Sequence, residues 1–265
     1  MRRFGTAVLA LAQVVGCVPD DPPGKQHSGA PVKPMPAVPF RAPSALAPGP
    51  LRSAAPAASG AQSRPGDDPA LSGPFADHFD RPALGPEWDP TSPSWRLEGG
   101  KLCVAQARNH PVWLKKKLPL NARIEFDATS YSEEGDIKAE LWGDGRSAAD
   151  HLSYNDATSY LTVFGGWKNS YHVLARLDEH APDRPEIRLE EDSNDVRARK
   201  VQPNRAYHFK VVRDDGRTVR WSVDDVDILA FTDPSPLSGP GHDHFGFNDW
   251  DVRVCFDNLT VTPLP

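Results

Sequence analysis

The sequence lacks an excess of positive charge, a long apolar run and any recognisable catalytic motif. Its 265 residues carry 30 Lys and Arg against 36 Asp and Glu, a formal charge of −6 that argues against nucleic acid as a partner. No apolar run approaches the roughly 20 residues that cross a bilayer as a helix. There is no Ser/His/Asp order, glycine-rich phosphate loop or metal-protease motif, and no window has the period of a long amphipathic helix.

The first seventeen residues have the pattern of an export signal. Met1-Arg2-Arg3 is a basic start, and residues 4–16 are mostly apolar or small, too short a run to span a membrane. The run ends in Val14-Val15-Gly16-Cys17, which resembles the bacterial lipobox. The resemblance implies that Cys17 carries lipid and becomes the new N-terminus, anchoring the protein in the bacterial cell envelope, at the outer membrane or cell surface. An ordinary signal peptide with a chance cysteine is the alternative.

Residues 18–72 have the composition of a linker. They hold 13 of the 28 prolines, and Phe40 is their only aromatic residue. Such a segment cannot bury enough apolar surface to offset the entropy of ordering, so we predict a disordered Pro/Ala-rich tether that proline keeps extended. Residues 1–72 hold 7 basic and 4 acidic residues, which leaves 23 and 32 in residues 73–265. The following domain is therefore acidic, and a polybasic membrane-binding role is not supported.

Residues 73–265 contain all seven tryptophans and show the two-residue period of β-strands. In residues 121–128, for example, Ala122, Ile124 and Phe126 alternate with charged residues. Similar runs follow, separated by turns rich in Gly and Asp, and residues 205–212 and 217–223 flank an Asp-Asp-Gly turn that predicts a hairpin. About a dozen short strands predict an all-β domain of two packed antiparallel sheets.

Motifs at both ends of this region resemble one family. The opening consists of Phe75-Ala-Asp-His-Phe-Asp-Arg81, Leu84-Gly-Pro-Glu-Trp88 and Trp95-Arg-Leu-Glu-Gly-Gly-Lys-Leu102, and the close is Cys255-Phe-Asp-Asn-Leu-Thr-Val261. These resemble bacterial concanavalin A-like lectin/glucanase domains. The middle, including Tyr207-His-Phe-Lys-Val-Val-Arg213, is similar to the 3-keto-disaccharide hydrolase-type branch and to laminin G-like relatives. The resemblance implies a jelly-roll sandwich over residues 73–265.

In that fold the first and last strands are neighbours, which has two consequences. Cys103 and Cys255 would be close enough for a disulfide in an oxidising compartment, with two buried free thiols as the alternative. Domains of this fold often bind structural calcium near the terminal strands, where Asp80 and Asp257 could contribute. Simple capping or turn formation by these aspartates competes with the calcium interpretation.

Catalysis would require a pair of carboxylates. Retaining glycosidases place two about 5 Å apart, but the Glu-x-Asp-x-x-Glu signature of laminarinase-like relatives is absent. The nearest pattern is Asp136, Lys138, Glu140 and Trp142, expected on one sheet face. That face could hold a sugar, with Glu140 or Asp136 as acid or base if the protein is an enzyme. It could equally be a solvated outer face.

Sugar sites also need flat aromatic rings and planar polar groups. Trp142, Trp167 and Trp250 each lie beside turn-forming residues, although any one of them could belong to the core. His172 and Arg176 share a face of the strand that follows Trp167. The predicted carbohydrate-binding residues are Glu140, Trp142, Tyr160, Trp167, His172, Arg176 and Trp250.

Two polar segments have less specific patterns. His242 and His244 would lie on one side of a strand, as zinc ligands sometimes do, but the preceding Gly-Pro-Gly favours an exposed loop. Residues 178–200 are dense in both charges and predict a hydrophilic loop with a solvated acidic cluster at 190–192.

The leading hypothesis from the sequence is a lipid-anchored envelope protein that displays a non-catalytic carbohydrate-binding sandwich. A glycoside-cleaving enzyme, as the keto-disaccharide hydrolase resemblance implies, is the second. A structural or protein-binding surface module is the third, since fold alone does not choose a function.

Overall fold

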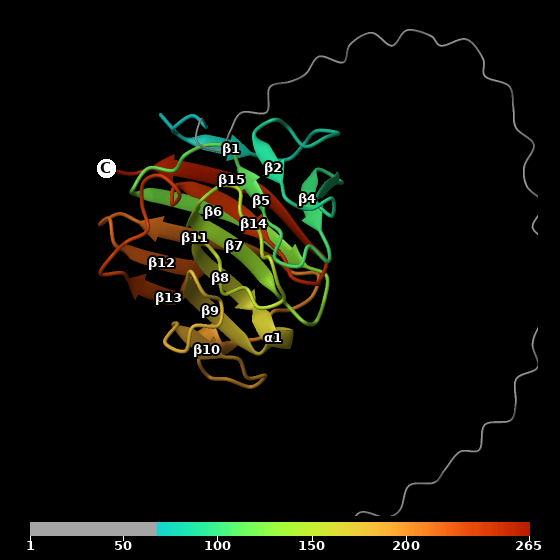
Figure 1. Ribbon diagram of the computed structural model, residues 1–265. Coiled ribbons are helices and arrows are strands. Elements are labelled where there is room, and N and C mark those ends of the chain that lie inside the picture. Colours follow the sequence, from blue (N-terminus) through green and yellow to red (C-terminus); the bar gives the residue numbers. More distant parts are fainter. Residues whose placement is uncertain (1–67) are drawn as a thin grey trace, which may run out of the picture. The chain divides into compact units, whose positions relative to one another are not determined.

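The computed structural model describes residues 68–265 (Figure 1). The predicted signal segment, Cys17 and linker residues 18–67 lie outside this range. Residues 68–72, which fall within the predicted linker, already pair with the domain: Leu71 N–H donates to Lys117 O, and Lys117 N–H to Pro69 O, both at 3.0 Å. Residues 68–72 are therefore part of the folded domain. Within residues 68–265, no helix has the length and apolar character needed to cross a membrane.

Two antiparallel sheets make up the domain, as the sequence predicts. One is eight-stranded, in the order β13-β12-β11-β6-β15-β4-β3, with β1 also paired to β15. Its strands are β1 (Phe75–Asp77), β3 (Arg96–Glu98), β4 (Lys101–Val104), β6 (Ala122–Ser130), β11 (Ala206–Arg213), β12 (Thr218–Val223), β13 (Val226–Thr232) and β15 (Val254–Pro263). We call it the first sheet.

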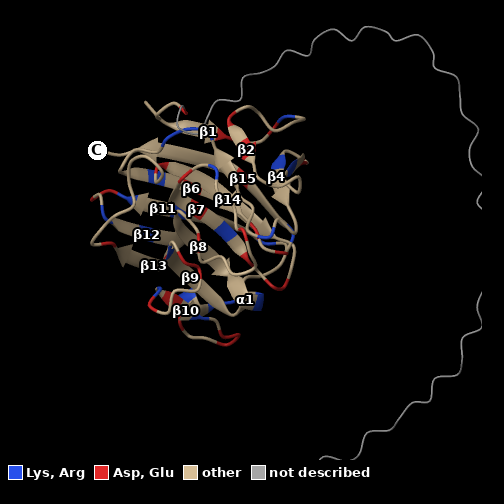
Figure 2. Cartoon of the chain, viewed as in Figure 1, with Lys and Arg blue, Asp and Glu red and all other residues tan. Residues whose placement is uncertain are grey.

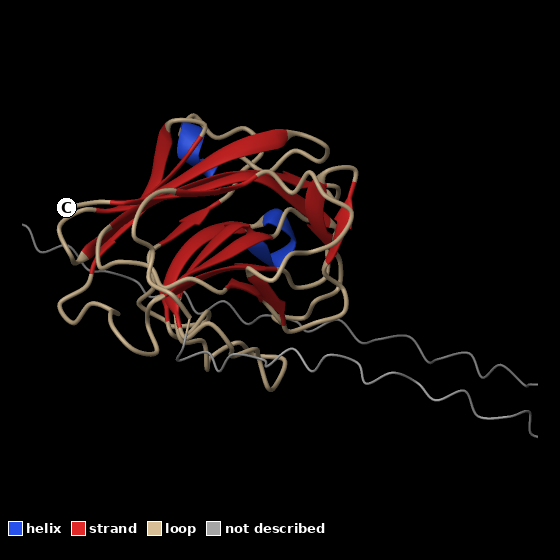
Figure 3. Cartoon of the chain, turned by 90° about the horizontal axis from the view of Figure 1, so that it is seen from above, coloured by secondary structure: helices blue, strands red, loops and turns tan. Residues whose placement is uncertain are grey.

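The second sheet is seven-stranded, in the order β10-β9-β8-β7-β14-β5-β2. Its strands are β2 (Trp88–Pro90), β5 (Val112–Leu114), β7 (Ile137–Gly143), β8 (Tyr160–Gly165), β9 (Tyr171–Arg176), β10 (Glu186–Arg188) and β14 (His244–Asn248). Two short helical turns, α1 (Gly166–Asn169) and η2 (Val196–Ala198), complete the elements of the described chain. Seen from above, the strands form two stacked layers (Figure 3). The all-β sandwich predicted from the strand periodicity is therefore confirmed.

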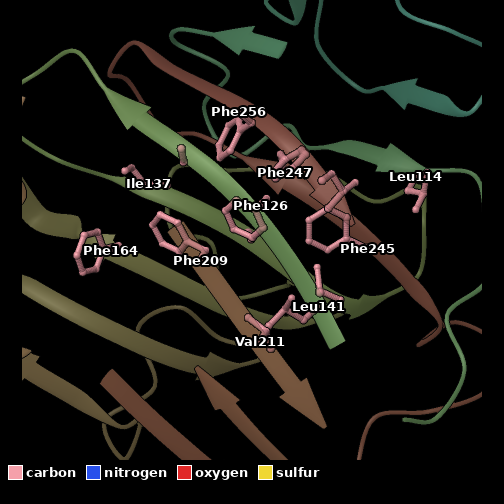
Figure 4. Packing of buried hydrophobic residues seen from close by; sticks show 14 of the residues in the cluster. Leu114, Phe126, Ile137, Leu141, Phe164, Phe209, Val211, Phe245, Phe247 and Phe256 are labelled. Atoms are coloured by element: carbon pink, nitrogen blue, oxygen red, sulfur yellow. The ribbon is translucent and has the colours of Figure 1, made fainter. Parts of the chain in front are cut away.

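Alternating side chains from both layers fill the space between the sheets. Along β6 every second residue is buried, and its Phe126 ring stacks on Phe209 of β11 at 4.8 Å between centroids. Phe247 of β14 meets Phe126 edge-on at 5.1 Å and stacks on Phe256 of β15 at 4.2 Å (Figure 4). This aromatic cluster joins the two sheets. The predicted hairpin is also present, because β11 pairs with β12 in antiparallel register, Phe209 facing Val223.

The ends of the domain meet in the first sheet. Strand β1 pairs with β15, Phe75 facing Val261. Cys103 of β4 lies directly opposite Cys255 of β15, and the two form a disulfide across 152 residues of sequence. The disulfide that the family resemblance implies is therefore confirmed. It closes residues 103–255 into one covalent loop.

Asp77 explains why the opening motif has an acidic residue between aromatic residues. Its carboxylate accepts hydrogen bonds from the backbone N–H of Phe79, from Arg81 at 2.6 and 2.8 Å, and from Trp88 Nε1 at 2.8 Å. Burial raises the pKa of Asp77, but these donors outweigh that effect and bring the pKa below its ordinary value. The carboxylate thus ties β1 to the following turn and to β2.

The outer face of the second sheet is not open to solvent along its whole length. Leu161 and Val163 of β8 and Val173 of β9 project away from the main core and pack against a second apolar cluster. That cluster includes Ala149, Tyr154 and Ala157 from the chain between β7 and β8. This loop covers part of that face.

Candidate functional site

A cavity of about 590 Å³ opens next to the covering loop. Six connections between strands contribute to its wall, among them those between β6 and β7, β8 and β9, and β14 and β15. The lining residues are Asn109, Glu134, Asp136, Lys138, Leu152, Trp167, Lys168, Glu179, His180, Trp250, Asp251 and Val252. Charged residues elsewhere gather mainly in loops and at strand ends (Figure 2). A cavity of this size is in the range of small-molecule sites.

Trp167 is held in the cavity wall by an unusual turn. Trp167, Lys168 and Asn169 of α1 have φ angles of 51°, 57° and 59°, so three consecutive non-glycine residues are left-handed. The Asn169 amide fixes this turn by donating to the carbonyls of Glu133 and Val201 and accepting from Val201 N–H at 2.9 Å. Left-handed conformations of this kind cost free energy and often occur at functional sites.

The turn also packs closely against the neighbouring connection. Asp136 N–H donates to Gly165 O at 3.0 Å, and a Cβ on Gly135 would lie 2.6 Å from the same oxygen. Only glycine fits at residue 135, where φ is +70°. The backbone thereby places Asp136 and Trp167 on the same cavity.

Arginines from outside the cavity stack on both tryptophan rings. The Arg184 guanidinium lies 4.5 Å from the Trp167 ring centre, and that of Arg108 lies 4.9 Å from the Trp250 ring centre. Arg108 also pairs with Asp251 at 3.2 Å. Neither arginine lines the cavity. The cations therefore restrict the rings without occupying the space in which a ligand would lie.

The cavity floor is built from buried polar groups. Lys138 Nζ lies 2.7 Å from Glu179 Oε1, 3.1 Å from Asn109 Oδ1 and 3.9 Å from Asp136 Oδ1. All four residues are more than nine-tenths buried. Burial alone would lower the Lys138 pKa, but Asp136 and Glu179 outweigh it and the pKa is raised. Lys138 is thus a fixed cation among carboxylates.

The negative charges of two aspartates near Lys138 are only partly balanced by the positive charge of that lysine. Burial raises the pKa of Asp136, opposed by the charge of Lys138. Burial raises the pKa of Asp249, just after β14, to about 7, and the charge of Asp136 adds to the rise. Asp136 Oδ2 and Asp249 Oδ1 are both buried without a hydrogen-bond partner. Such groups are uncommon in folded proteins and mark candidate sites.

Glu140 lies on the same sheet face as Lys138 but is sealed beneath the covering loop. It is 0% exposed and does not line the cavity. Its carboxylate accepts from Tyr154 Oη at 2.6 Å, Ser159 Oγ at 2.6 Å and Asn248 Nδ2 at 2.7 Å. Burial raises its pKa to about 7, opposed by these three donors. The prediction that Glu140 binds sugar or acts as acid or base is therefore wrong. Its carboxylate instead joins the covering loop to the sheet.

Three other predicted binding residues lie between the sheets. Trp142 is 0% exposed, donates from Nε1 to Pro119 O at 3.0 Å and has the Arg213 guanidinium 3.7 Å from its ring centre. The pairing of β7 with β14 shifts register near His244, and φ of Trp142 is 53°. This bulge interrupts the alternation and turns Trp142 into the core, so its predicted surface position is wrong.

The predicted binding positions of Tyr160 and His172 are wrong for a different reason. Their strands alternate as expected, but these two side chains are on the face that meets the other sheet. Tyr160 is 0% exposed and donates to Asp233 Oδ2 at 2.7 Å. His172 is 0% exposed, stacks on Phe164 at 4.0 Å and accepts from Gly165 N–H at 3.0 Å. Burial lowers the His172 pKa to about 3. Both residues support the core rather than a ligand.

Arg176 lies away from the main cavity. Its Nε donates to Asp233 Oδ2 at 2.6 Å, and it lines a separate cavity of about 220 Å³. Of the seven predicted carbohydrate-binding residues, the structure therefore brings together Trp167 and Trp250 on one cavity. Asp136, predicted only as an alternative catalytic group, lines it with them.

Several lining residues carry no functional signal in the amino-acid sequence. Asn109, Leu152, Glu179 and Val252 come from four different connections, and none stands in a recognisable motif. Leu152 is a large apolar side chain left 76% exposed, on the loop that covers the sheet. An exposed leucine cannot be distinguished from a buried one by local sequence, so no signal was present to find it.

Of the two predicted calcium ligands, Asp257 already has a cationic partner. Asp257 Oδ2 accepts from Lys101 Nζ at 2.9 Å. Across residues 68–265, Asp150, His151 and Asp156 are the one group that brings three acidic, His or Cys ligand atoms within 4.8 Å, and all three are exposed. Asp80 and Asp257 do not belong to such a group.

The two histidines also have separate contacts. His242 Nδ1 lies 2.7 Å from Thr158 O, whereas His244, only 2% exposed, lies between Asp243 and Asp68. The expectation of two exposed loop histidines is thus wrong for His244. The acidic cluster at 190–192 is exposed, as expected of a solvated segment.

Comparison with known proteins identifies the fold rather than a family. No family model matches the chain, and no curated protein matches it by sequence. Among solved structures, the carbohydrate recognition domain of Emp47p aligns with a TM-score of 0.51 and 12% identity over 72% of this chain and 95% of that one.

Two further alignments have lower scores. The carbohydrate binding module CBM66 from Bacillus subtilis aligns at 0.49 with 16% identity, over 66% of this chain and 95% of that one. The alginate lyase Aly36B aligns at 0.44 with 10% identity, over 73% and 98%. The chain thus shares the β-sandwich fold of the Emp47p carbohydrate recognition domain.

Proposed function

We propose that the domain binds carbohydrate, without cleaving it, in the cavity between Trp167 and Trp250. The observation that carries this proposal is the combination of an apolar rim with a buried polar floor. Trp167, Trp250, Leu152 and Val252 supply apolar surface, on which the C–H faces of a sugar ring can stack. The fold likeness by itself does not select a ligand.

The floor supplies the second requirement for sugar recognition. Asn109, Asp136 and Glu179 are planar groups that can accept or donate hydrogen bonds to hydroxyls, and Lys138 holds them in register. Because these side chains are already buried and mutually bonded, they lose little freedom when a ligand binds. A preformed polar floor favours specific recognition of a polar ligand over a general apolar one.

Cleavage is less well supported because the carboxylates have unsuitable surroundings. Glu140, the group expected to act as acid or base, does not reach the cavity. Of the lining carboxylates, Glu179 is bonded to Lys138 at 2.7 Å and Asp251 to Arg108 at 3.2 Å. A hydrolytic pair needs one carboxyl free to donate a proton and a second to attack or activate water. Asp136 is held 3.9 Å from Lys138 Nζ, and Glu134, the remaining lining carboxylate, is exposed.

A glycan-array screen of the full chain, with and without calcium, tests the proposal. Trp167→Ala and Trp250→Ala should each weaken any binding found by about five- to thirtyfold, since one lost stacking contact is worth about 1 to 2 kcal/mol. Phe75→Ala is the matched control. It is a half-buried ring on the first sheet with a stacked cation, Lys116 at 5.6 Å, and it does not line the cavity.

The control should lose stability without losing affinity. If no glycan binds under either condition, or if both tryptophan variants bind as the wild type does, carbohydrate binding in this cavity is refuted. Release of a reducing sugar from a bound glycan would instead establish the hydrolase alternative.

We further propose that lipid on Cys17 anchors the domain to the bacterial envelope. The Val14-Val15-Gly16-Cys17 motif at the end of an apolar run supports this. Metabolic labelling with a fatty acid should mark the wild type and not Cys17→Ala, which should move from the membrane to the soluble fraction. An unlabelled wild-type protein would refute the anchor without affecting the binding site.

A further inference from the structure

The cavity wall carries a surplus of negative charge. Its lining includes the carboxylates of Glu134, Asp136, Glu179 and Asp251 and two lysines, Lys138 and Lys168, and Arg108 outside the lining pairs with Asp251, so one negative charge is left over. One of these lysines, Lys138, is at the floor, where the surroundings are buried and charges interact more strongly than at the exposed rim. The charge balance at the floor therefore decides which ligands are favoured.

Lys138 does not neutralise the floor by itself. Its nearest contacts are Glu179 at 2.7 Å and Asn109 at 3.1 Å, while Asp136 is 3.9 Å away. Asp249 lies close enough for its charge to raise the Lys138 pKa as well. One ammonium group thus faces the carboxylates of Glu179, Asp136 and Asp249. Glu179 contacts it directly, and of the other two it is Asp136 that lines the cavity.

Asp136 has unused capacity to bind a donor. The residue is 7% exposed, and its Oδ2 is buried without a hydrogen-bond partner. Leaving such an atom unpaired costs about 1 to 3 kcal/mol, more when the group is charged. The Asp136 side chain as a whole is 11% exposed and lines the cavity, and a ligand that places a cationic N–H donor against its exposed part gains a hydrogen bond and the charge attraction.

We propose that the ligand is an amine-bearing saccharide, whose ammonium group pairs with Asp136. This inference rests on the proposed function, because it names the class of sugar for the same cavity. A hydroxyl at that position supplies a hydrogen bond without charge, and an acetamido group is neutral and larger. A uronate or sulfated sugar would meet like charge, which disfavours it.

The backbone makes a shape-conserving test available. Asp136 has φ of +61°, a conformation that Asn tolerates well. Asp136→Asn therefore removes the charge and leaves the turn intact. Asp225→Asn is a matched control, because Asp225 also has φ of +61°, its side chain is 88% exposed, and it lies in the turn between β12 and β13.

The experiment is isothermal titration of the full chain with matched oligosaccharides at pH 6. The probes are hexamers of glucosamine, N-acetylglucosamine and glucose with the same linkage, and the corresponding galacto-configured set. We expect the amine form to bind at least about tenfold more tightly than its hydroxyl form at 20 mM salt. The preference should shrink at 200 mM salt, because screening weakens charge pairing. Asp136→Asn should reduce it to about twofold or less, and Asp225→Asn should leave it unchanged.

Each outcome decides the inference separately from the proposed function. If a hydroxyl or acetylated form binds as tightly as the amine form, or if the preference survives in Asp136→Asn, the inference is overturned while carbohydrate binding stands. If some glycan of the array binds but no amine-bearing probe does, the inference is likewise overturned. If no glycan binds at all, the proposed function fails together with it.

Discussion

Ionisation of the buried Glu140 carboxylate should destabilise the domain at neutral and alkaline pH. Burial raises its pKa from 4.5 to about 7. Between these values the native state keeps a proton that the unfolded chain has released, so the free energy of unfolding falls as pH rises from about 4.5 to 7 and is level above. At about 1.4 kcal/mol for each tenfold change in the dissociation constant, the loss is roughly 3 kcal/mol.

Glu140→Gln should remove this part of the pH dependence. The amide can accept the bonds from Tyr154 and Asn248 at one oxygen and can donate to Ser159, whose hydroxyl also accepts. Some pH-independent cost of the new geometry is expected. Relative to the wild type, the variant should therefore gain about 2 to 3 kcal/mol of stability between pH 5 and pH 8.5. Asp249 has a pKa raised to about 7 in both proteins and leaves a common slope in the same direction.

Urea denaturation followed by tryptophan fluorescence, at intervals from pH 5 to 8.5, measures this difference. Glu125→Gln is the control, since it removes one negative charge from β6, where Glu125 pairs with Arg123 at 2.9 Å and does not touch the Glu140 network. The control should follow the wild-type pH curve. If the Glu140→Gln and wild-type curves run parallel across the range, the assignment of a costly buried carboxylate is refuted.

Two further predictions concern the covalent loop and the cavity turn. Replacing Cys103 and Cys255 by serine should lower the free energy of unfolding by up to about 5 kcal/mol, the chain-entropy value for a loop of 152 residues, and an unchanged urea midpoint would contradict this. Gly135→Ala should cost more stability than Gly99→Ala, because both glycines have positive φ but only at Gly135 would the new Cβ meet a backbone oxygen, at 2.6 Å. The same variant should weaken glycan binding, and equal effects of the two substitutions would show that the close approach of the turns is unimportant.

Much of the sandwich could be predicted from local sequence. The alternation around Phe126 fixes which side of β6 is buried, and the Asp-Asp-Gly turn marks the hairpin of β11 and β12. The disulfide followed from a long-range argument, since the family resemblance implies neighbouring terminal strands. The strand and hairpin predictions share a cause, since strand period and turn chemistry are properties of a few adjacent residues.

The errors in the candidate site also have particular causes. Trp142 was placed on the surface because strict alternation was assumed through a bulge that depends on the facing strand β14. His172 was placed on an exposed face because alternation reveals that a strand has two faces but not which one meets the other sheet. Glu140 was expected to be accessible because nothing in its own strand indicates that Tyr154, from the next loop, covers it.

The amino-acid order alone determined that this chain forms strands and where they turn, because both depend on short-range steric and hydrophobic preferences. The pairing of Cys103 with Cys255 was instead implied by the family resemblance. The three-dimensional packing decided which aromatic rings share a cavity and which carboxylate is left without a partner. Trp167, Trp250 and Asp136 meet only because connections far apart in the sequence converge at one end of the second sheet. The charge on each group there depends on how much water its neighbours exclude, which no linear pattern records.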